Sequence, residues 1–269
     1  MLVRPYARHA HVSDAYRTPP TNYVQLLQHI ATAKRLNQLD ALIKDYGDKF
    51  DAVHVSAALA VVPRLLGDAV ERGSGLEPGR REQPEQILTR LQEMATAQTE
   101  RMQVRQISNM IWSLGKCHKL TGGRDEAGPG RALARRLLAE LARGNHRKLH
   151  QGGRLTDAAQ LLHGLARLRL RAPAAQAAVA KLARGAVAAG RPVAASNLAL
   201  IMWGFGRLGY KDPGTLRLLA DRVAEEKLYL RPWSAAAALR TLQVQHVRHD
   251  ALAAAAAEVR ARARGGALG

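Results

Sequence analysis

The sequence contains little of several residue types, and each shortage excludes a class of protein. Cys117 is the only cysteine, so a disulfide-stabilised scaffold is excluded. Phe, Trp and Tyr together make up 4% of the 269 residues, and β-branched residues are also sparse, which argues against a β-sandwich or a β-barrel. No run of about eighteen apolar residues occurs, so no membrane-spanning helix is predicted.

Acidic residues are the other shortage. The chain has 22 Asp and Glu against 41 Lys and Arg, of which 32 are arginine, and its formal net charge is +19. A sequence pI near 11.1 predicts a polyanionic partner, typically nucleic acid. Hydrophobic residues make up 47% of the chain, which is enough for a sizeable core. Because its 49 alanines are accompanied by abundant leucine and arginine, the composition predicts an all-α, anion-binding protein of a reducing compartment.

Internal repetition organises this composition. Residues 107–116 and 198–207 resemble each other closely, and they share a tryptophan, a glycine and a cation in the same register (Trp112 and Trp203, Gly115 and Gly206, Lys116 and Arg207). Three weaker copies carry Ala60, His163 and Arg240 at the position of the tryptophan. In chain order, the five register positions are 52, 51, 40 and 37 residues apart. The two short spacings predict a repeat of 37 to 40 residues.

Two helices are predicted for each repeat, an amphipathic helix followed by a more apolar one. Asp212 and Pro213 are expected to begin an amphipathic helix, while Pro192 and Pro232 are each expected to open an apolar one. Gly209 is expected near a helix end, where a left-handed residue is favoured.

We therefore predict an all-α fold, an α-solenoid of about five helical-hairpin repeats with a right-handed superhelix. Its eleven or twelve helices would form a single domain over residues 24–264. Gly- and Pro-rich loop insertions are expected near residues 73–84 and 122–130. Residues 1–23 are interpreted as a basic N-terminal arm or the remnant of a transit peptide, and residues 265–269 as a C-terminal tail.

The repeated segments resemble the octotricopeptide repeats, helical-hairpin repeats related to those of FAST-kinase-like proteins. The resemblance rests on residues 111–116, 202–213 and 230–239, and it covers most of residues 50 to 250. It implies RNA binding in chloroplasts or mitochondria. Members of the family act in transcript stability, processing or translation, and some are embedded in organellar ribosomes.

Two patterns of cations predict where RNA would bind. Between Arg131 and Arg191 the sequence has 13 Lys or Arg and only two acids, so this stretch repels itself unless a polyanion neutralises it. Four cations, of which Arg167 also belongs to that stretch, share one register, where they would form a ladder on stacked repeats or would cap the ends of their helices. Together the two patterns give the predicted RNA-binding residues, which are Arg64, Lys116, Arg131, Arg135, Arg136, Arg143, Arg147, Lys148, Arg154, Arg167, Arg169, Arg171 and Arg207.

Other motifs favour a structural interpretation. Trp112 and Trp203 could stack on bases, but tryptophan on a helix between two layers more often lies in the core. Residues 204–209 match the dinucleotide-binding glycine pattern, but they end a predicted helix instead of following a strand. Cys117 and His118 have no matching second pair for zinc. We therefore predict no catalytic residues, metal site, cofactor or small-molecule substrate, and we expect that the protein is not an enzyme.

Small size and irregular repeats favour one function within the RNA-binding class. We expect a structural subunit of a mitochondrial ribosome, with structured rRNA and neighbouring ribonucleoprotein subunits as its partners and no membrane partner. The first alternative is a transcript-specific factor for the stability, processing or translation of an organellar mRNA. The second is a scaffold that binds peptides. A mitochondrial location is expected, with the chloroplast as the alternative.

Overall fold

The computed structural model describes residue 20 and residues 22–71, 82–120, 129–143 and 147–265. Within these ranges the chain is helical and contains no strand, which confirms the predicted all-α class. The described residues form thirteen α-helices and three short 3-10 segments. The α-helices are α1 (Tyr23–Thr32), α2 (Leu36–Tyr46), α3 (Ala52–Glu71), α4 (Glu82–Gln98), α5 (Val104–Leu120), α6 (Pro129–Ala142), α7 (Arg147–Gly152), α8 (Leu155–Leu168), α9 (Pro173–Ala188), α10 (Ala195–Leu208), α11 (Pro213–Glu225), α12 (Pro232–Val244) and α13 (Asp250–Gly265). The 3-10 segments are η1 (Gly47–Lys49), η3 (Thr99–Arg101) and η4 (Lys227–Tyr229).

Several predicted irregular segments lie largely outside the described residues. These are the N-terminal arm, the C-terminal tail and most of the two loop insertions. α1 begins at Tyr23, α4 at Glu82 and α6 at Pro129, so the last residues of both predicted insertions are already helical.

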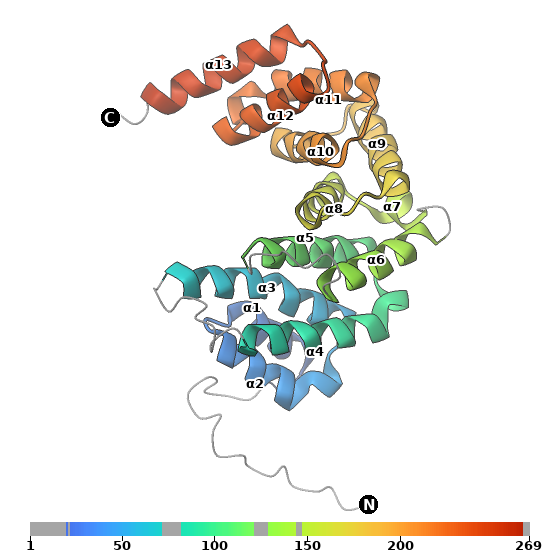
Figure 1. Ribbon diagram of the computed structural model, residues 1–269, viewed down its shortest axis with the longest axis vertical. Coiled ribbons are helices and arrows are strands. Elements are labelled where there is room, and N and C mark those ends of the chain that lie inside the picture. Colours follow the sequence, from blue (N-terminus) through green and yellow to red (C-terminus); the bar gives the residue numbers. More distant parts are fainter. Residues whose placement is uncertain (1–19, 21, 72–81, 121–128, 144–146, 266–269) are drawn as a thin grey trace, which may run out of the picture.

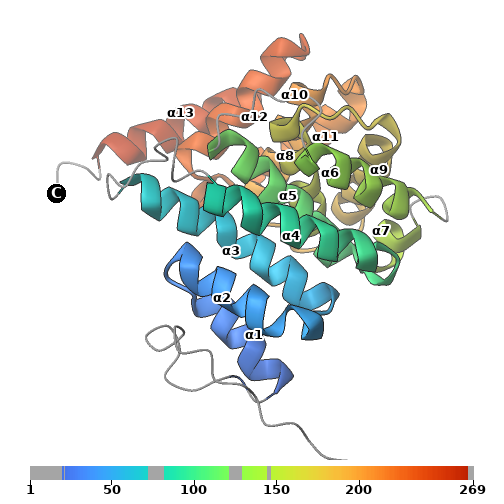
Figure 2. The ribbon, with the colours of Figure 1, turned by 60° about the horizontal axis from the view of Figure 1, so that its bottom comes forward.

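The helices lie in two layers. In the first layer α1, α3, α5, α8, α10 and α12 pack each against the next, and they follow one another along the molecule (Figure 1). In the second layer α2, α4, α6, α9, α11 and α13 pack in the same order, and α7 packs against α9. Figure 2 shows α2 and α4 beside α3. The buried Leu, Ala and Val side chains form one continuous core.

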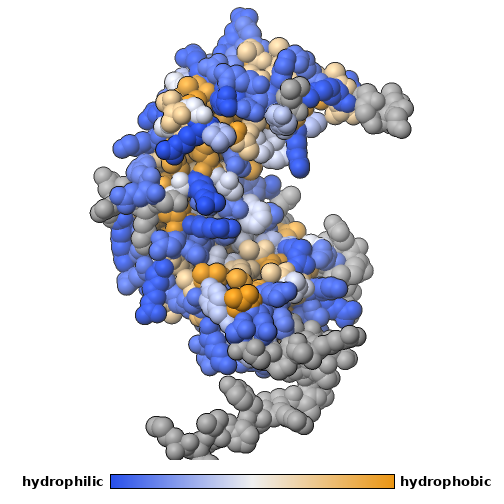
Figure 3. Space-filling model, turned by 180° about the vertical axis from the view of Figure 1, so that it is seen from behind, coloured by the Kyte–Doolittle hydropathy of each residue, from blue (hydrophilic) through white to orange (hydrophobic). Residues whose placement is uncertain are grey.

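The stack of helices curves along its length. Seen from behind, the molecule is hollowed on one side, and hydrophilic side chains border much of the hollow (Figure 3). All five register positions of the sequence repeat fall on first-layer helices: Ala60 on α3, Trp112 on α5, His163 on α8, Trp203 on α10 and Arg240 on α12.

Local sequence signals place several helix ends. Asp212 accepts a hydrogen bond from the backbone N–H of Thr215 at 3.0 Å and so caps α11, and Pro232 opens α12, as predicted. Gly209 ends α10 with φ +72°, a left-handed conformation that costs glycine little. The expected helix start at Pro192 is wrong, because α10 begins only at Ala195. Residues 191–194 form a non-helical connection whose Val193 is buried in the core.

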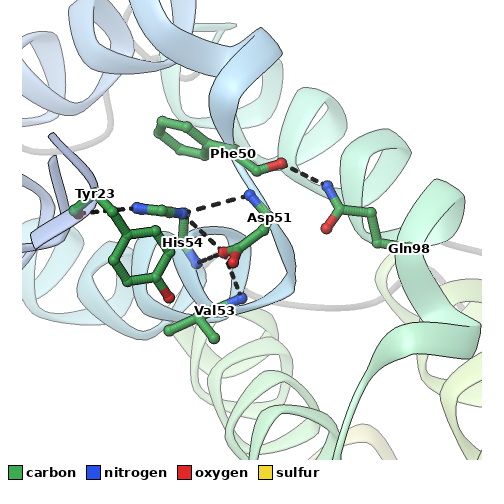
Figure 4. Close-up of polar contacts among 6 residues, drawn as sticks. All are labelled: Tyr23, Phe50, Asp51, Val53, His54 and Gln98. Atoms are coloured by element: carbon green, nitrogen blue, oxygen red, sulfur yellow. Dashed lines mark hydrogen bonds and ion pairs between the residues drawn. The ribbon is translucent and has the colours of Figure 1, made fainter.

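Polar contacts at the start of α3 join it to α1 and α4 (Figure 4). Asp51 accepts hydrogen bonds from the backbone N–H groups of Val53 and His54, both at 3.0 Å, and its carboxylate lies 2.8 Å from His54 Nδ1. His54 Nε2 lies 3.3 Å from the carbonyl oxygen of Tyr23. Gln98 Nε2, at the end of α4, donates to the carbonyl oxygen of Phe50 at 2.7 Å. His54 is only 1% exposed, so its imidazole lies in the interior and helps to hold α1 and α3 together.

Glycines set the close approach of the first-layer helices. A Cβ on Gly115 of α5 would lie 2.8 Å from the carbonyl oxygen of Gly164 in α8, and a Cβ on Gly204 of α10 would lie 2.7 Å from the Cβ of Leu162. A Cβ on Gly206 would likewise lie 2.9 Å from Oγ1 of Thr241 in α12. A larger residue at these positions would push the backbones apart, so these three glycines allow α5, α8, α10 and α12 to approach closely.

Candidate nucleic-acid interface

A groove opens beside the C-terminal parts of four first-layer helices, α5, α8, α10 and α12. Its volume is about 630 Å³. Arg167 and Arg207 lie in the last turns of α8 and α10, Arg169 directly follows α8, and Arg240 lies on α12. Within the described part of the chain, none of the residues that line the groove carries a carboxylate. We name this feature the arginine groove and define it by Arg167, Arg169, Arg207 and Arg240.

The backbone at the end of α8 is held in place. Arg169 has a left-handed conformation with φ +54°, and its N–H donates to the carbonyl oxygen of Ala166 at 3.3 Å. Its own carbonyl oxygen accepts a hydrogen bond from Nη2 of Arg131 on α6 at 3.4 Å. A left-handed conformation costs a non-glycine residue about 1 kcal/mol, so the neighbouring contacts compensate for this strain. The side chain of Arg169 remains exposed at the groove.

Aromatic rings accompany the cations near the groove. Lys116 Nζ lies 3.7 Å from the centroid of the Trp112 ring, one helical turn earlier on α5. Burial lowers the pKa of the Lys116 ammonium, and the positive charge of Arg167 lowers it further. The lowered pKa of Lys116 on α5 therefore reflects, besides burial, the closeness of the second cation, Arg167 on α8. An added anion would relieve this repulsion.

The second tryptophan lies in the groove itself. Trp203 is half-buried, packs against the core and also lines the groove. Its ring centroid lies 5.0 Å from that of His163, and the guanidinium carbon of Arg167 lies 5.5 Å from its centroid. Trp112 is likewise only partly buried. The expectation that both tryptophans face the interior is therefore only half right, because each also reaches the surface.

The predicted cation ladder is continuous over part of its length. Arg167 and Arg207 both line the groove, and Lys116 lies close enough to Arg167 for its pKa to respond. Arg64 has a different role, because its Nη2 donates to the carbonyl oxygens of Ala31 at 3.3 Å and Ala33 at 2.8 Å. It therefore caps the C-terminal end of α1, a neighbouring helix and not its own.

The basic stretch from Arg131 to Arg191 does not form one face. Arg131, Arg135 and Arg136 lie on α6, in the second layer, and Arg143 directly follows it, whereas Arg167 and Arg169 lie at the groove. Arg135 and Arg136 are exposed. Arg143 is compensated, since its Nη1 lies 3.1 Å from Glu100 and 2.8 Å from Glu140. Two further predicted cations, Arg154 directly before α8 and Arg171 shortly after it, are exposed, and the side chains of Arg147 and Lys148 lie outside the described residues.

Three groove residues with a charged or aromatic side chain are absent from the predicted site. Arg240 stands at a register position, but it was interpreted there only as a degenerate replacement of tryptophan. The spacing that put it in line with Trp203 was the signal that could have found it. His118 and Trp203 also line the groove, and their exposure depends on how α5, α8 and α10 pack.

Comparisons with known proteins do not assign a family. No protein-family model matches the sequence, and no curated protein matches it. Among the described helices, none has the length and apolar character needed to cross a membrane. The same residues contain no cluster of three or more His, Cys, Asp or Glu side chains arranged for a metal ion.

Proposed function

We propose that the protein is an RNA-binding α-solenoid of octotricopeptide-like repeats that serves as a structural, rRNA-binding subunit of a mitochondrial ribosome. The arginine groove is the observation that carries the RNA-binding part of this proposal. Four guanidinium groups line it without a carboxylate among the described lining residues. Guanidinium groups form bidentate hydrogen bonds to phosphate and also stack on bases, so this set of side chains suits RNA.

Electrostatics favours a polyanion at the groove over a peptide. Gathering like charges costs free energy, and a bound phosphate backbone lowers that cost while releasing its own counterions. A scaffold for ordinary peptides would be expected to carry charges of both signs. None of the described carboxylates lines the groove. Those of Glu225 and Glu226, for example, pair with Arg222 on α11.

The helix packing supports the repeat architecture in this proposal. Each register helix of the first layer packs against the second-layer helix that follows it in the chain, which gives the pairs α3–α4, α5–α6, α8–α9, α10–α11 and α12–α13. These five pairs fit five helical hairpins, with α1 and α2 before the first of them. A right-handed superhelix remains part of the proposal.

The choice of structured rRNA rests on the chemical variety at the register positions. Proteins that read one base per repeat use equivalent side chains at equivalent positions. Here the five positions hold alanine, tryptophan, histidine, tryptophan and arginine. This variety suits binding to the shape and phosphates of a folded RNA. The mitochondrial location belongs to the same proposal and rests on the family resemblance.

RNA binding can be tested with two charge-matched triple variants. Arg167, Arg207 and Arg240 would be changed to Glu in one, and the exposed Arg35, Arg105 and Arg217, none of which belongs to the predicted RNA-binding residues, in the other. Binding of a fluorescent single-stranded RNA would be followed by anisotropy over a range of salt concentrations. We expect log K to fall by ~0.7 per contacted phosphate as log salt rises, and the groove variant to lose about 2 from that slope.

The control variant carries the same total charge, so it should retain most of the affinity. Equal losses in both variants would place the binding surface outside the groove, and a flat salt response in the wild-type protein would contradict RNA binding. The ribosomal role has a separate test. The native protein should co-migrate with ribosomal subunits of a mitochondrial extract on a high-salt sucrose gradient, and free migration would contradict the structural role.

A further inference from the structure

The arginine groove has the dimensions of a small-ligand site. Its volume of about 630 Å³ falls within the range of roughly 300–1,000 Å³ that small-molecule sites occupy. A duplex could touch its rim with phosphates, but a groove of this size holds a single nucleotide. Phosphate binding alone would require only the arginines, and the groove also contains an aromatic ring.

Trp203 gives the groove an apolar, flat surface. The indole is half-buried on α10, where the ring of His163 lies against it at a centroid distance of 5.0 Å with an interplanar angle of 33°. The indole is held in place because Trp203 also packs against buried residues of the core. A ring held in this way loses little freedom when a base stacks on it, and the Arg167 guanidinium, which lies over the ring at 5.5 Å from its centroid, gives a base a second planar group to stack on.

Two further cations line the groove together with this surface. Arg207 lies one turn after Trp203 on α10, and Arg240 lies on α12, the next helix of the first layer. They are therefore available to the phosphates of a nucleotide whose base lies against Trp203. This arrangement combines stacking and charge in the manner of single-strand binding sites.

We propose that the arginine groove binds one unpaired nucleotide of an RNA strand, with its base against Trp203 and the flanking phosphates at Arg207 and Arg240. This inference rests on the proposed RNA-binding function and adds the kind of RNA that is recognised, a single-stranded segment or a loop. It also gives Trp203 a role in base recognition in addition to its role in the core.

The test uses the full chain with Trp203 as its sole tryptophan. Trp112→Phe and Trp233→Phe together remove the other two. The probe is a single-stranded oligoadenylate of about eight nucleotides, within the size range of known single-strand sites. The control is a strand of equal length with abasic sugars, which has the same phosphates but nothing to stack. Anisotropy would report the bound fraction of each strand, and tryptophan fluorescence would report contact with Trp203.

We expect the oligoadenylate to quench Trp203 and to bind about tenfold more tightly than the abasic strand. Trp203→Leu, which keeps an apolar side chain in the core, should abolish this preference, while Trp203→Phe should retain part of it. Binding of the oligoadenylate without a change in Trp203 fluorescence would overturn the inference and leave RNA binding by phosphate contacts intact. Equal quenching by the abasic strand would overturn it as well.

Two further outcomes separate the inference from its premise. If neither strand binds at low salt, the proposed RNA-binding function fails and the inference fails with it. Free adenosine monophosphate offers the same base and phosphate without a strand. If it quenches Trp203 at the same concentrations as the oligoadenylate, the groove is a mononucleotide site, and its assignment to an RNA strand is overturned.

Discussion

Substitution of Gly164 by alanine tests the close packing of α5 and α8. A Cβ at this position would overlap the carbonyl oxygen of Ile111, and it would lie 2.5 Å from the carbonyl carbon of Ile111 and 2.7 Å from the backbone nitrogen of Trp112. All three are backbone atoms of α5, so they cannot yield by a change of rotamer. Either α8 or α5 must move as a whole, and the surrounding core must open with it.

The expected loss is the difference between two effects. Overpacking of a core costs about 1–3 kcal/mol, and backbone contacts belong at the upper end of that range, about 3 kcal/mol. Alanine in place of glycine within a helix gains about 1 kcal/mol of helix propensity. Gly164→Ala should therefore lower the free energy of unfolding by about 2 kcal/mol. Urea unfolding followed by far-ultraviolet circular dichroism would measure the change.

Gly185 in α9 provides a matched control. No atom lies within 4 Å of a Cβ placed there, so Gly185→Ala should gain about 1 kcal/mol from propensity alone. The two substitutions are chemically identical and should change stability in opposite directions. A Gly164→Ala variant as stable as the wild type would refute the argument that this glycine sets the distance between α5 and α8.

Three other residues give further predictions. Asp212→Ala should remove the cap of α11 and cost about 1 kcal/mol at pH 7. Hydrogen bonds from the hydroxyl and N–H of Thr215 lower the pKa of Asp212, so the difference from wild type should start to shrink below pH ~4 and vanish only below the lowered pKa of the folded protein, which urea unfolding at a series of pH values would measure. Burial raises the pKa of the Cys117 thiol to about 12, so an aromatic disulfide reagent at pH 8 should react with it far more slowly in the folded protein than in urea, and equal rates would contradict its burial. Arg64→Met should cost about 1 kcal/mol by freeing the carbonyl oxygen of Ala33, yet leave RNA affinity in the anisotropy assay unchanged, and a clear loss of affinity would return Arg64 to the binding surface.

Helices and their ends were the most predictable part of the fold, since their signals are local in the sequence. The Asp212 cap acts three residues away, and Gly209 acts at the end of its own helix. The predicted helix start at Pro192 was wrong, because a proline can also lie in the connection before a helix. The burial of Val193, in the non-helical connection of residues 191–194, depends on the neighbouring helices.

The partners of the cations could not be predicted from the sequence. Arg64 was grouped with Lys116, Arg167 and Arg207 by register, but its hydrogen-bond acceptors lie 31 and 33 residues earlier in the chain. Arg143 pairs with Glu100, which is 43 residues away, and the intervening segment contains a predicted insertion. A count of charges along the sequence misses such compensation. The stretch from Arg131 to Arg191 was therefore expected to act as a single surface, although its cations lie on different layers.

The position of the groove follows from helix electrostatics as much as from ligand binding. Each helix carries a partial negative charge at its C-terminal end, which stabilises a nearby cation by about 0.3–1 kcal/mol. Arg167 and Arg207 lie in the last turns of α8 and α10 and benefit from this effect, whereas a cation in mid-helix would not. The same helix ends are brought together by the glycines that let α5, α8, α10 and α12 approach closely. Alignment of the helix ends therefore lowers the cost of concentrating arginines where no carboxylate among the described lining residues neutralises them. Capping of helix ends and binding of phosphate are thus compatible roles for one side chain, because the guanidinium keeps donors that the helix does not use.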